Sequence, residues 1–232
     1  MTKILISDFD NTLYTSESEL ENNIKSINNF INNGNIFVIA TGRSYIDISK
    51  FTEKYKIQFS YLICNDGGTI FDENGNLIYR KDIPSNVVND IYKYLEKNNL
   101  LGITYFDTGF DYVKFPNQYT NAIIIRDINK EKSINILKFI VNNYNSVHGY
   151  ISDYWINITA RSVTKSNGIK IISEINNYDK DNIFTIGDTI NDISMIQDYN
   201  GACMKNSTND LKSICKKTFD SVAEYIDYIK KI

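Results

Sequence analysis

The sequence predicts a protein of the α/β class with a second, α+β unit inserted into it. Short apolar stretches of strand length alternate with amphipathic helical stretches at both ends of the 232-residue chain, which is typical of a parallel sheet. Between about residues 82 and 159 the pattern changes to a helix followed by several strands, twice over. We therefore expect a Rossmann-like, parallel-sheet core from residues 1–81 and 160–232, and an inserted α+β unit from residues 82–159.

The first part of the chain is expected to supply strands, helices and one hairpin of the core. Its expected strands are continuous apolar runs, which indicate burial. Its helices carry apolar residues at helical spacing, and Asn33-Gly34 ends the first of them. The expected elements are strands 3–7, 36–40 and 61–64, helices 19–33 and 44–55, and a hairpin of 69–71 with 77–79 that turns at 73–75.

The middle of the chain has two similar halves, each a helix followed by strands. Pro84 opens the first helix, and Thr108-Gly109 separates two of the strands. The expected elements are helices 85–98 and 130–142 and strands 101–107, 110–115, 122–126, 147–152 and 154–160. The alternation of strands and helices returns with Lys165. It predicts helices 166–177, 191–198 and 220–231 and strands 182–186 and 201–204.

Composition and charge exclude several classes of protein. The net charge is −3 and charged residues are 23% of the chain, so we expect no basic face and no nucleic-acid partner. No run of about 18 apolar residues is present, so we expect no membrane-spanning segment. His148 is the only histidine, which argues against mechanisms that need a catalytic imidazole.

The three cysteines, Cys64, Cys203 and Cys215, are odd in number and far apart in the sequence. They lack a Cys-x-x-Cys pair and a Cys/His ligand spacing, so we expect neither a disulfide nor a structural zinc site. Asp8 interrupts the first apolar stretch too early for a secretory signal. The expectation is therefore three buried, reduced thiols in a cytoplasmic protein.

Polar side chains follow three of the expected core strands at the point where each strand ends. They are Asp8 and Asp10, then Thr41, then Asp188, Asn191 and Asp192. The strand ends of a parallel sheet meet at one edge, where open α/β folds bind ligands. Four of these groups are acidic, and such a concentration of carboxylates is unfavourable without a cation, for which Mg²⁺ is the natural candidate. Each motif alone has a second interpretation as turn or helix-capping residues.

Four short motifs resemble those of the haloacid dehalogenase (HAD) superfamily. They are Asp8-Phe9-Asp10-Asn11-Thr12-Leu13, Ala40-Thr41-Gly42-Arg43, Lys165-Ser166-Asn167-Gly168 and Gly187-Asp188-Thr189-Ile190-Asn191-Asp192. Asn65-Asp66-Gly67-Gly68 is similar to the Asn-Gly-rich loop of the Cof-type branch, from which Asp66 is a departure. Residues 82–159 resemble a C2B-type cap. The resemblance covers essentially the whole chain and implies phosphoryl transfer.

The resemblance implies a role for each of these residues. Asp8 would be the nucleophile that forms an aspartyl-phosphate, and Asp10 would be the general acid and base. The phosphoryl group would be bound by Thr41, Gly42, Lys165 and Asn191. Mg²⁺ would be held by Asp8, the backbone carbonyl of Asp10, Asp188 and Asp192, with Asp192 set behind the direct ligands. Phosphoryl transfer needs charge neutralisation and no histidine, which agrees with this chain.

The leading hypothesis is a Mg²⁺-dependent phosphatase that hydrolyses a small phosphorylated metabolite, since sugar phosphates are the usual substrates of the resembled branch. A hexose phosphomutase is the alternative, because phosphomannomutases share this type of cap. A mutase needs clustered arginines in its cap, whereas this region has only Arg126, with Arg161 at its border. A non-enzymatic phosphate-binding domain is disfavoured by the presence of Asp10. We expect a monomer or a weak homodimer.

Some residues keep two interpretations. Arg43 is either a contact near the hinge to the cap or a partner in a surface ion pair. Tyr150, Tyr154 and Trp155 either pack the cap sheet or stack on the substrate. Substrate specificity is expected in residues 82–159, because the core motifs recognise only the phosphoryl group and the metal. The candidate contacts there are Tyr112, Lys114 and Asn157.

Overall fold

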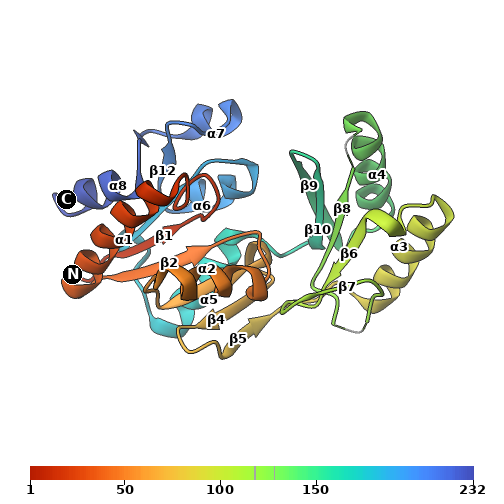
Figure 1. The fold of residues 1–232 in the computed structure, drawn as a ribbon, viewed down its shortest axis with the longest axis horizontal. Helices are drawn as coiled ribbons and strands as arrows, with labels where there is room; N and C mark the ends of the chain where they lie inside the picture. Colours follow the sequence, from red (N-terminus) through yellow and green to blue (C-terminus); the bar gives the residue numbers. More distant parts are fainter. Residues whose placement is uncertain (118, 128) are drawn as a thin grey trace.

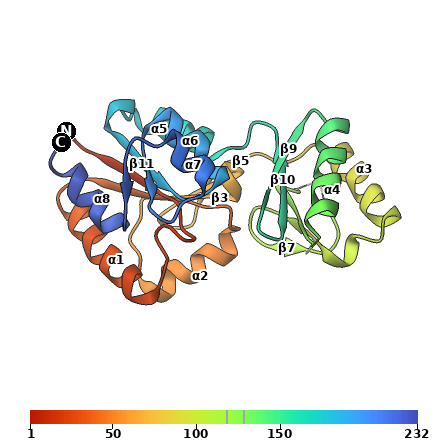
Figure 2. The ribbon, with the colours of Figure 1, turned by 90° about the horizontal axis from the view of Figure 1, so that it is seen from above.

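The structure of the protein is a computed structural model that describes residues 1–117, 119–127 and 129–232. Figures 1 and 2 show two units side by side, each built of one sheet with its own helices. The larger unit, the core, has an eight-stranded sheet in the order β13-β12-β11-β1-β2-β3-β4-β5. The smaller unit, the cap, has a five-stranded sheet in the order β7-β6-β8-β10-β9. The expected α/β core with an inserted α+β unit is confirmed.

The strands of the core sheet are parallel except at one edge. They are β1 (Ile4–Ser7), β2 (Ile36–Ala40), β3 (Tyr61–Cys64), β4 (Thr69–Asp72), β5 (Leu77–Arg80), β11 (Ile183–Gly187), β12 (Asn200–Met204) and β13 (Thr218–Phe219). β4 pairs antiparallel with both β3 and β5. β1 is buried along its whole length, as its apolar sequence predicts for a strand covered on both faces.

Helices cover both faces of the core sheet. They are α1 (Glu17–Asn32), α2 (Tyr45–Tyr55), α5 (Lys165–Asn176), α6 (Ile193–Asp198), α7 (Asn209–Ile214) and α8 (Val222–Ile229), with short 3₁₀ turns η1 (Asn65–Gly67), η3 (Lys180–Asn182) and η4 (Ile190–Asp192). Figure 2 shows α1, α2 and α8 on one face and α5, α6 and α7 on the other. Each face has its own cluster of buried apolar side chains. The apolar stripe of each helix is thereby buried against the sheet.

β1 lies at the centre of the core sheet, between β2 and β11. The chain continues to β2 and β3 on one side and to β12 and β13 beyond β11 on the other, so the strand order reverses at β1. Parallel pairing puts Ser7 beside Ile39 on one side and beside Ile186 on the other. The residues that follow these three strands therefore share one edge, and open α/β sheets bind ligands at such a reversal.

The cap sheet is antiparallel throughout. Its strands are β6 (Thr104–Asp107), β7 (Tyr112–Val113), β8 (Ala122–Arg126), β9 (Val147–Ser152) and β10 (Trp155–Ala160), and its helices are α3 (Ser85–Lys97) and α4 (Lys130–Asn143), with a 3₁₀ turn η2 (Leu101–Ile103). Both helices pack on the face that is turned away from the core (Figure 2). The opposite face of the sheet is left to face the core.

Most expected elements form within a few residues of their predicted bounds, and the exceptions are short. The expected strand 101–107 begins with the turn η2, and only Tyr112–Val113 of the expected strand 110–115 pairs as β7. The sequence pattern did not predict α7 or β13, because six and two residues are too short to show a period. None of the helices in the described parts of the chain is long and apolar enough to cross a membrane.

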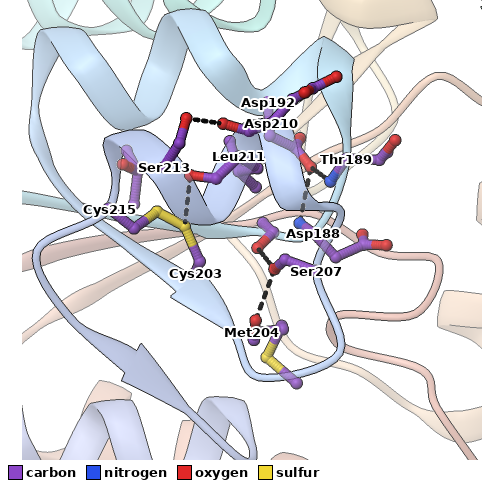
Figure 3. The surroundings of a disulfide bond; sticks show 12 residues. Asp188, Thr189, Asp192, Cys203, Met204, Ser207, Asp210, Leu211, Ser213 and Cys215 are labelled. Atoms are coloured by element: carbon purple, nitrogen blue, oxygen red, sulfur yellow. Dashed lines mark hydrogen bonds between the residues drawn. A yellow bond between two sulfur atoms is a disulfide. The ribbon is translucent and has the colours of Figure 1, made fainter.

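The expectation of three reduced cysteines is wrong for two of them. Cys203, in β12, and Cys215, just after α7, are joined as a disulfide with their Cα atoms 6.1 Å apart (Figure 3). The unpredicted helix α7 is the reason, because it turns the chain back so that Cys215 lies beside β12. Cys64 is free and buried, and burial raises the pKa of its thiol, so it is a core residue as expected.

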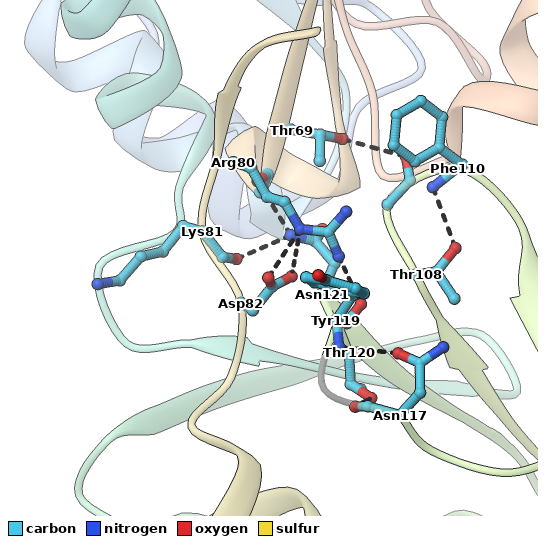
Figure 4. A network of polar contacts seen from close by, with 12 residues as sticks. Thr69, Arg80, Lys81, Asp82, Thr108, Phe110, Asn117, Tyr119, Thr120 and Asn121 are labelled. Carbon is cyan, nitrogen blue, oxygen red and sulfur yellow. Dashed lines mark hydrogen bonds and ion pairs between the residues drawn. The ribbon is translucent and has the colours of Figure 1, made fainter.

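Polar side chains fix the connection from β5 into the cap (Figure 4). Arg80 donates through Nε to both carboxylate oxygens of Asp82, at 2.9 and 2.7 Å. Asn121, fully buried in the cap, donates to the backbone carbonyls of Gly68 and Lys81 at 3.0 and 2.7 Å. The cap is therefore anchored by side chains as well as by the chain itself.

Candidate active site

Three buried aspartates meet at the edge where the strand order reverses. Oxygen atoms of Asp8, Asp188 and Asp192 all lie within 4.8 Å of one another. Asp8 directly follows β1 and Asp188 directly follows β11, and the backbone N–H of Asp8 donates to Ile186 O at 2.9 Å. The parallel pairing of β1 with β11 thus brings together carboxylates that are about 180 residues apart in the sequence.

Lys165 lies between two of these carboxylates. It is fully buried, and its ammonium group donates to Asp8 Oδ1 at 2.5 Å and to Asp192 Oδ1 at 2.7 Å. It is the first residue of α5, whose N-terminus is capped by the side chain of Thr164. Burial by itself lowers the pKa of Lys165, but the carboxylates of Asp192 and Asp8 outweigh burial and raise it. Lys165 therefore remains charged in the folded protein.

Asp192 is fully occupied by contacts within the protein. Its second oxygen accepts the backbone N–H groups of Asp188 at 2.9 Å and Thr189 at 3.1 Å (Figure 3). A Cβ atom at Gly187 would lie 2.4 Å from the Asp192 carboxyl group, so only glycine fits there. Asp192 thus orients Lys165 and the loop after β11.

The carboxylate environment fits a divalent cation. Burial raises the pKa of Asp8 well above its usual range, and Lys165 opposes this shift. Burial, together with Asp192, raises the pKa of Asp188 to about 6, although its Oδ1 accepts a hydrogen bond from the Thr12 hydroxyl at 3.0 Å. A bound cation would favour the charged forms. The hard oxygen donors are those that Mg²⁺ prefers.

Asp10 lies outside this buried cluster. Its carboxylate accepts two hydrogen bonds from Arg43, from Nε at 2.8 Å and from Nη2 at 2.6 Å. The Arg43 guanidinium also lies over the ring of Phe51, 4.6 Å from its centroid, and the hydrogen bonds to Asp10 raise the pKa of Arg43. Arg43 is thus an ion-pair partner, but its partner is the predicted acid and base rather than an unrelated surface residue.

Thr41 and Gly42 follow β2 at the same edge. The backbone N–H of Thr41 donates to Ile63 O at 2.8 Å, which ties this loop to β3. The buried hydroxyl of Thr41 accepts the N–H of Arg43 at 3.1 Å, so the hydroxyl proton remains for an oxygen of a ligand. Asn191, in η4, donates its amide to the Asp66 carboxylate at 2.9 Å.

A cavity of about 580 Å³ lies between this edge of the core and the cap. Its core wall consists of Asp8, Asp10, Asn11, Gly42, Arg43, Asp47, Thr189 and Asn191. Its cap wall consists of Tyr105, Tyr112, Ile124, Tyr150, Ser152, Asp153, Trp155 and Asn157. Half of the core-wall residues are charged and half of the cap-wall residues are aromatic, so the cavity suits a small ligand with one ionic end.

Comparison with known families identifies the family of this chain. A model of the haloacid dehalogenase-like hydrolases matches residues 5–148 and 114–226. The chain is a HAD-like hydrolase. The family resemblance of the four sequence motifs is thereby confirmed, and the protein belongs to a family of enzymes.

Relatives and solved structures agree with this assignment over the whole chain. A candidate phosphatase from Buchnera aphidicola is 28% identical, with all of both chains covered. The 5-amino-6-(5-phospho-D-ribitylamino)uracil phosphatase of Bacillus subtilis is 24% identical over 96% of this chain and 90% of its own. A HAD subclass IIB sugar phosphatase of known structure has a TM-score of 0.80 at 19% identity, with all of both chains covered, and so shares the fold.

The structure brings the predicted site residues of this HAD-like hydrolase to one place. Asp8, Asp10, Gly42 and Asn191 line the cavity. Thr41, Lys165, Asp188 and Asp192 are buried behind that surface. Of the predicted cap contacts, Tyr112 and Asn157 line the cavity, whereas Lys114 instead places its ammonium group 3.9 Å from the centre of the Tyr105 ring. Trp155 and Tyr150 also line the cavity, and Tyr154 is exposed elsewhere.

Sequence reasoning missed two features of the site. The pairing of Arg43 with Asp10 joins residues from two different loops, and only the fold brings them together. Asp66 is noted in the sequence only as a departure from a loop pattern, yet it is 6% exposed and contacts both Asn191 and Tyr150. The Asn-Asp-Gly-Gly sequence is a signal of an unusual turn, but it does not reveal these partners.

Proposed function

We propose that the protein is a Mg²⁺-dependent phosphatase that hydrolyses small phosphomonoesters through an aspartyl-phosphate on Asp8. The observation that supports this most strongly is the buried group of Asp8, Lys165, Asp188 and Asp192 at the floor of a cavity of about 580 Å³. A phosphate ester brings negative charge, and this floor supplies a charged lysine and donor oxygens for a cation. The site is therefore suited to charge neutralisation, which phosphoryl transfer requires.

In the first half of the proposed reaction a carboxylate oxygen of Asp8 attacks phosphorus and the bond from phosphorus to the ester oxygen breaks. In this step Asp10 is released from Arg43 and protonated, and it gives its proton to the departing oxygen. Lys165 offsets charge on Asp8 and on the phosphoryl group, and the Thr41 hydroxyl and the Gly42 N–H donate hydrogen bonds to phosphoryl oxygens. Asn191 completes this set of donors.

In the second half Asp10 takes a proton from water, and that water attacks phosphorus of the phospho-Asp8. The bond between Asp8 and phosphorus breaks, inorganic phosphate leaves, and Asp8 is restored. Mg²⁺ bound by Asp8, Asp188 and the Asp10 carbonyl would neutralise charge on the transferred group. In this scheme Asp192 does not bind Mg²⁺ directly. It orients Lys165 and the loop that carries Asp188 through hydrogen bonds.

We propose residues 82–159 as the cap that selects the substrate and residues 1–81 and 160–232 as the catalytic core. The aromatic wall supports a compact organic group such as a sugar. A hexose phosphomutase has less support, because the described cap residues that line the cavity include no arginine or lysine to hold a second phosphate.

The test is a screen of phosphomonoesters with purified protein, with release of inorganic phosphate as the measurement. We expect hydrolysis of p-nitrophenyl phosphate and of at least one sugar phosphate in Mg²⁺, and loss of activity in EDTA that returns when Mg²⁺ is restored. Undiminished activity in EDTA would reject the metal. Transfer of phosphate within a hexose phosphate, without release, would favour the mutase.

A further inference from the structure

Asp66 joins three parts of the site through hydrogen bonds. Its backbone N–H donates to Thr41 O at 3.0 Å, which attaches its turn to the loop of the phosphate-binding residues. One carboxylate oxygen accepts the amide of Asn191 at 2.9 Å, and the other accepts the hydroxyl of Tyr150 at 2.6 Å. Asp66 has a left-handed backbone with φ of 56°, a conformation that Asp and Asn tolerate better than most residues.

Tyr150 is the partner that comes from the cap. It lies in β9, the strand at one edge of the cap sheet, so its hydrogen bond to Asp66 crosses the boundary between cap and core. Burial, and next the charge of Asp66, raise the pKa of Tyr150 well above its usual range. Tyr150 therefore keeps its proton and donates a hydrogen bond to Asp66.

The contact lies directly against the proposed phosphate site. A Cβ atom at Gly42 would be 3.4 Å from both Asp66 Oδ1 and the Tyr150 hydroxyl. The pair of Asp66 and Tyr150 therefore lies against Gly42, beside the N–H that would bind phosphate. Opening the cap would withdraw Tyr150 from this place and leave Asp66 with Asn191 alone.

We propose that Asp66 is a positioning residue that couples closure of the cap, through Tyr150, to the orientation of Asn191 at the phosphate site. The part of the proposal that concerns catalysis rests on the proposed phosphatase function. The hydrogen bond is charge-assisted and largely buried, and bonds of this kind are among the stronger ones in proteins. A closed cap thus holds Asp66, and Asp66 holds the Asn191 amide.

The chain offers its own reporter of closure. Trp155 is the only tryptophan, and it lines the cavity from the cap side with 38% of its surface exposed. Quenching of its fluorescence by acrylamide, in the substrate-free protein, reports how open the cavity is. This measurement needs no turnover, so it tests the coupling to closure even if no phosphomonoester is hydrolysed.

The first variant is Tyr150→Phe, with Tyr154→Phe as its matched control, because Tyr154 is an exposed tyrosine at the tip of the same hairpin. Loss of a hydrogen bond to a charged group shifts an equilibrium by about ten-fold or more. We expect Tyr150→Phe to increase acrylamide quenching of Trp155 and to lower kcat/KM for p-nitrophenyl phosphate about ten-fold. The control should change neither.

The second variant, Asp66→Ala, removes both hydrogen bonds and should lower kcat/KM further, by about 100-fold, and weaken competitive inhibition by inorganic phosphate. The double variant with Tyr150→Phe should be no worse than Asp66→Ala alone, because both changes break the same bond. Multiplied effects in the double variant, or unchanged quenching in Tyr150→Phe, would overturn the coupling. If the wild type hydrolyses no ester while quenching changes as expected, the phosphatase function fails and the contact between cap and core stands.

Discussion

The two walls of the cavity are held in place by different forces. Behind the core wall, Lys165 is fully buried between Asp8 and Asp192, and each of these groups has a charged partner. On the cap wall, Trp155 is 38% exposed and its ring lies 5.4 Å from the guanidinium of Arg126. Removing one member of a buried charge cluster leaves an uncompensated charge, whereas a half-exposed aromatic residue can be exchanged at small cost. We therefore expect substitutions behind the core wall to cost more stability and activity than substitutions in the cap wall.

The largest effect is expected from Asp8→Asn in the core wall of the cavity. An amide is a poor nucleophile and lacks the negative charge that a cation needs, so turnover should fall by about 10⁴-fold or more. The fold should persist, because the amide oxygen can still accept from Lys165. Phosphate release and thermal unfolding measure the two effects. Mass spectrometry that finds phosphate on another residue, such as Ser7, would contradict the assignment.

The next largest effect is expected from Lys165→Met. Asp8 and Asp192 would then lose their shared buried cation, which should lower the unfolding free energy by about 3–5 kcal/mol and the activity by about 10²–10³-fold. Lys170→Met is the matched control, because Lys170 is an exposed lysine of the same helix and should change stability by less than about 0.5 kcal/mol. Equal urea unfolding curves for the two variants would show that the buried charge of Lys165 does not stabilise the folded protein.

A smaller effect is expected from Trp155→Ala in the cap wall of the cavity. Loss of the ring should raise KM for the preferred substrate about ten-fold, through lost contact with the leaving group, while kcat and Mg²⁺ dependence remain. Tyr154→Ala, at an exposed position outside the cavity, is the control. Steady-state kinetics on two esters with different leaving groups measures KM and kcat separately for Trp155→Ala and for the control. A large fall in kcat with unchanged KM would place Trp155 in the chemistry instead.

The smallest effect on activity is expected at Asp107, in the cap strand β6, where a substitution should change stability alone. Burial raises the pKa of Asp107 from 3.8 to about 6, so the folded chain binds the proton more tightly than the unfolded chain. The unfolding free energy therefore falls as the pH rises from about 4 to about 6 and stays lower above that range. Asp107→Asn should remove this fall and stabilise the protein by about 2 kcal/mol at pH 8, with activity unchanged.

Urea unfolding at pH 5 and pH 8 measures this contribution. Asp111→Asn is the control, because Asp111 is an exposed aspartate on the same hairpin. An equal pH dependence in wild type and Asp107→Asn would show that Asp107 is ionised in the folded state at low pH.

Local patterns predicted the elements of the core but not the short ones near its edge. The strands β1, β2 and β11 are apolar runs followed by polar residues, and both properties are visible in the sequence. Helix α7 has six residues, too few for a hydrophobic period, and missing it also meant missing the pairing of Cys203 with Cys215. A disulfide depends on where the chain returns, which sequence spacing does not give.

The amino-acid sequence by itself determined the family, the alternation of strands and helices, and the set of residues that gather at the sheet edge. The strands and the polar residues that follow them are visible as patterns of a few neighbouring residues, whereas the strand order and its reversal at β1 come from pairing of distant segments. Only the tertiary structure decided that Asp10 pairs with Arg43 and that Asp66 receives Tyr150 from the cap. These partners lie 33 and 84 residues apart. Their meeting depends on how loops and units pack together, and no local pattern of residues encodes that packing.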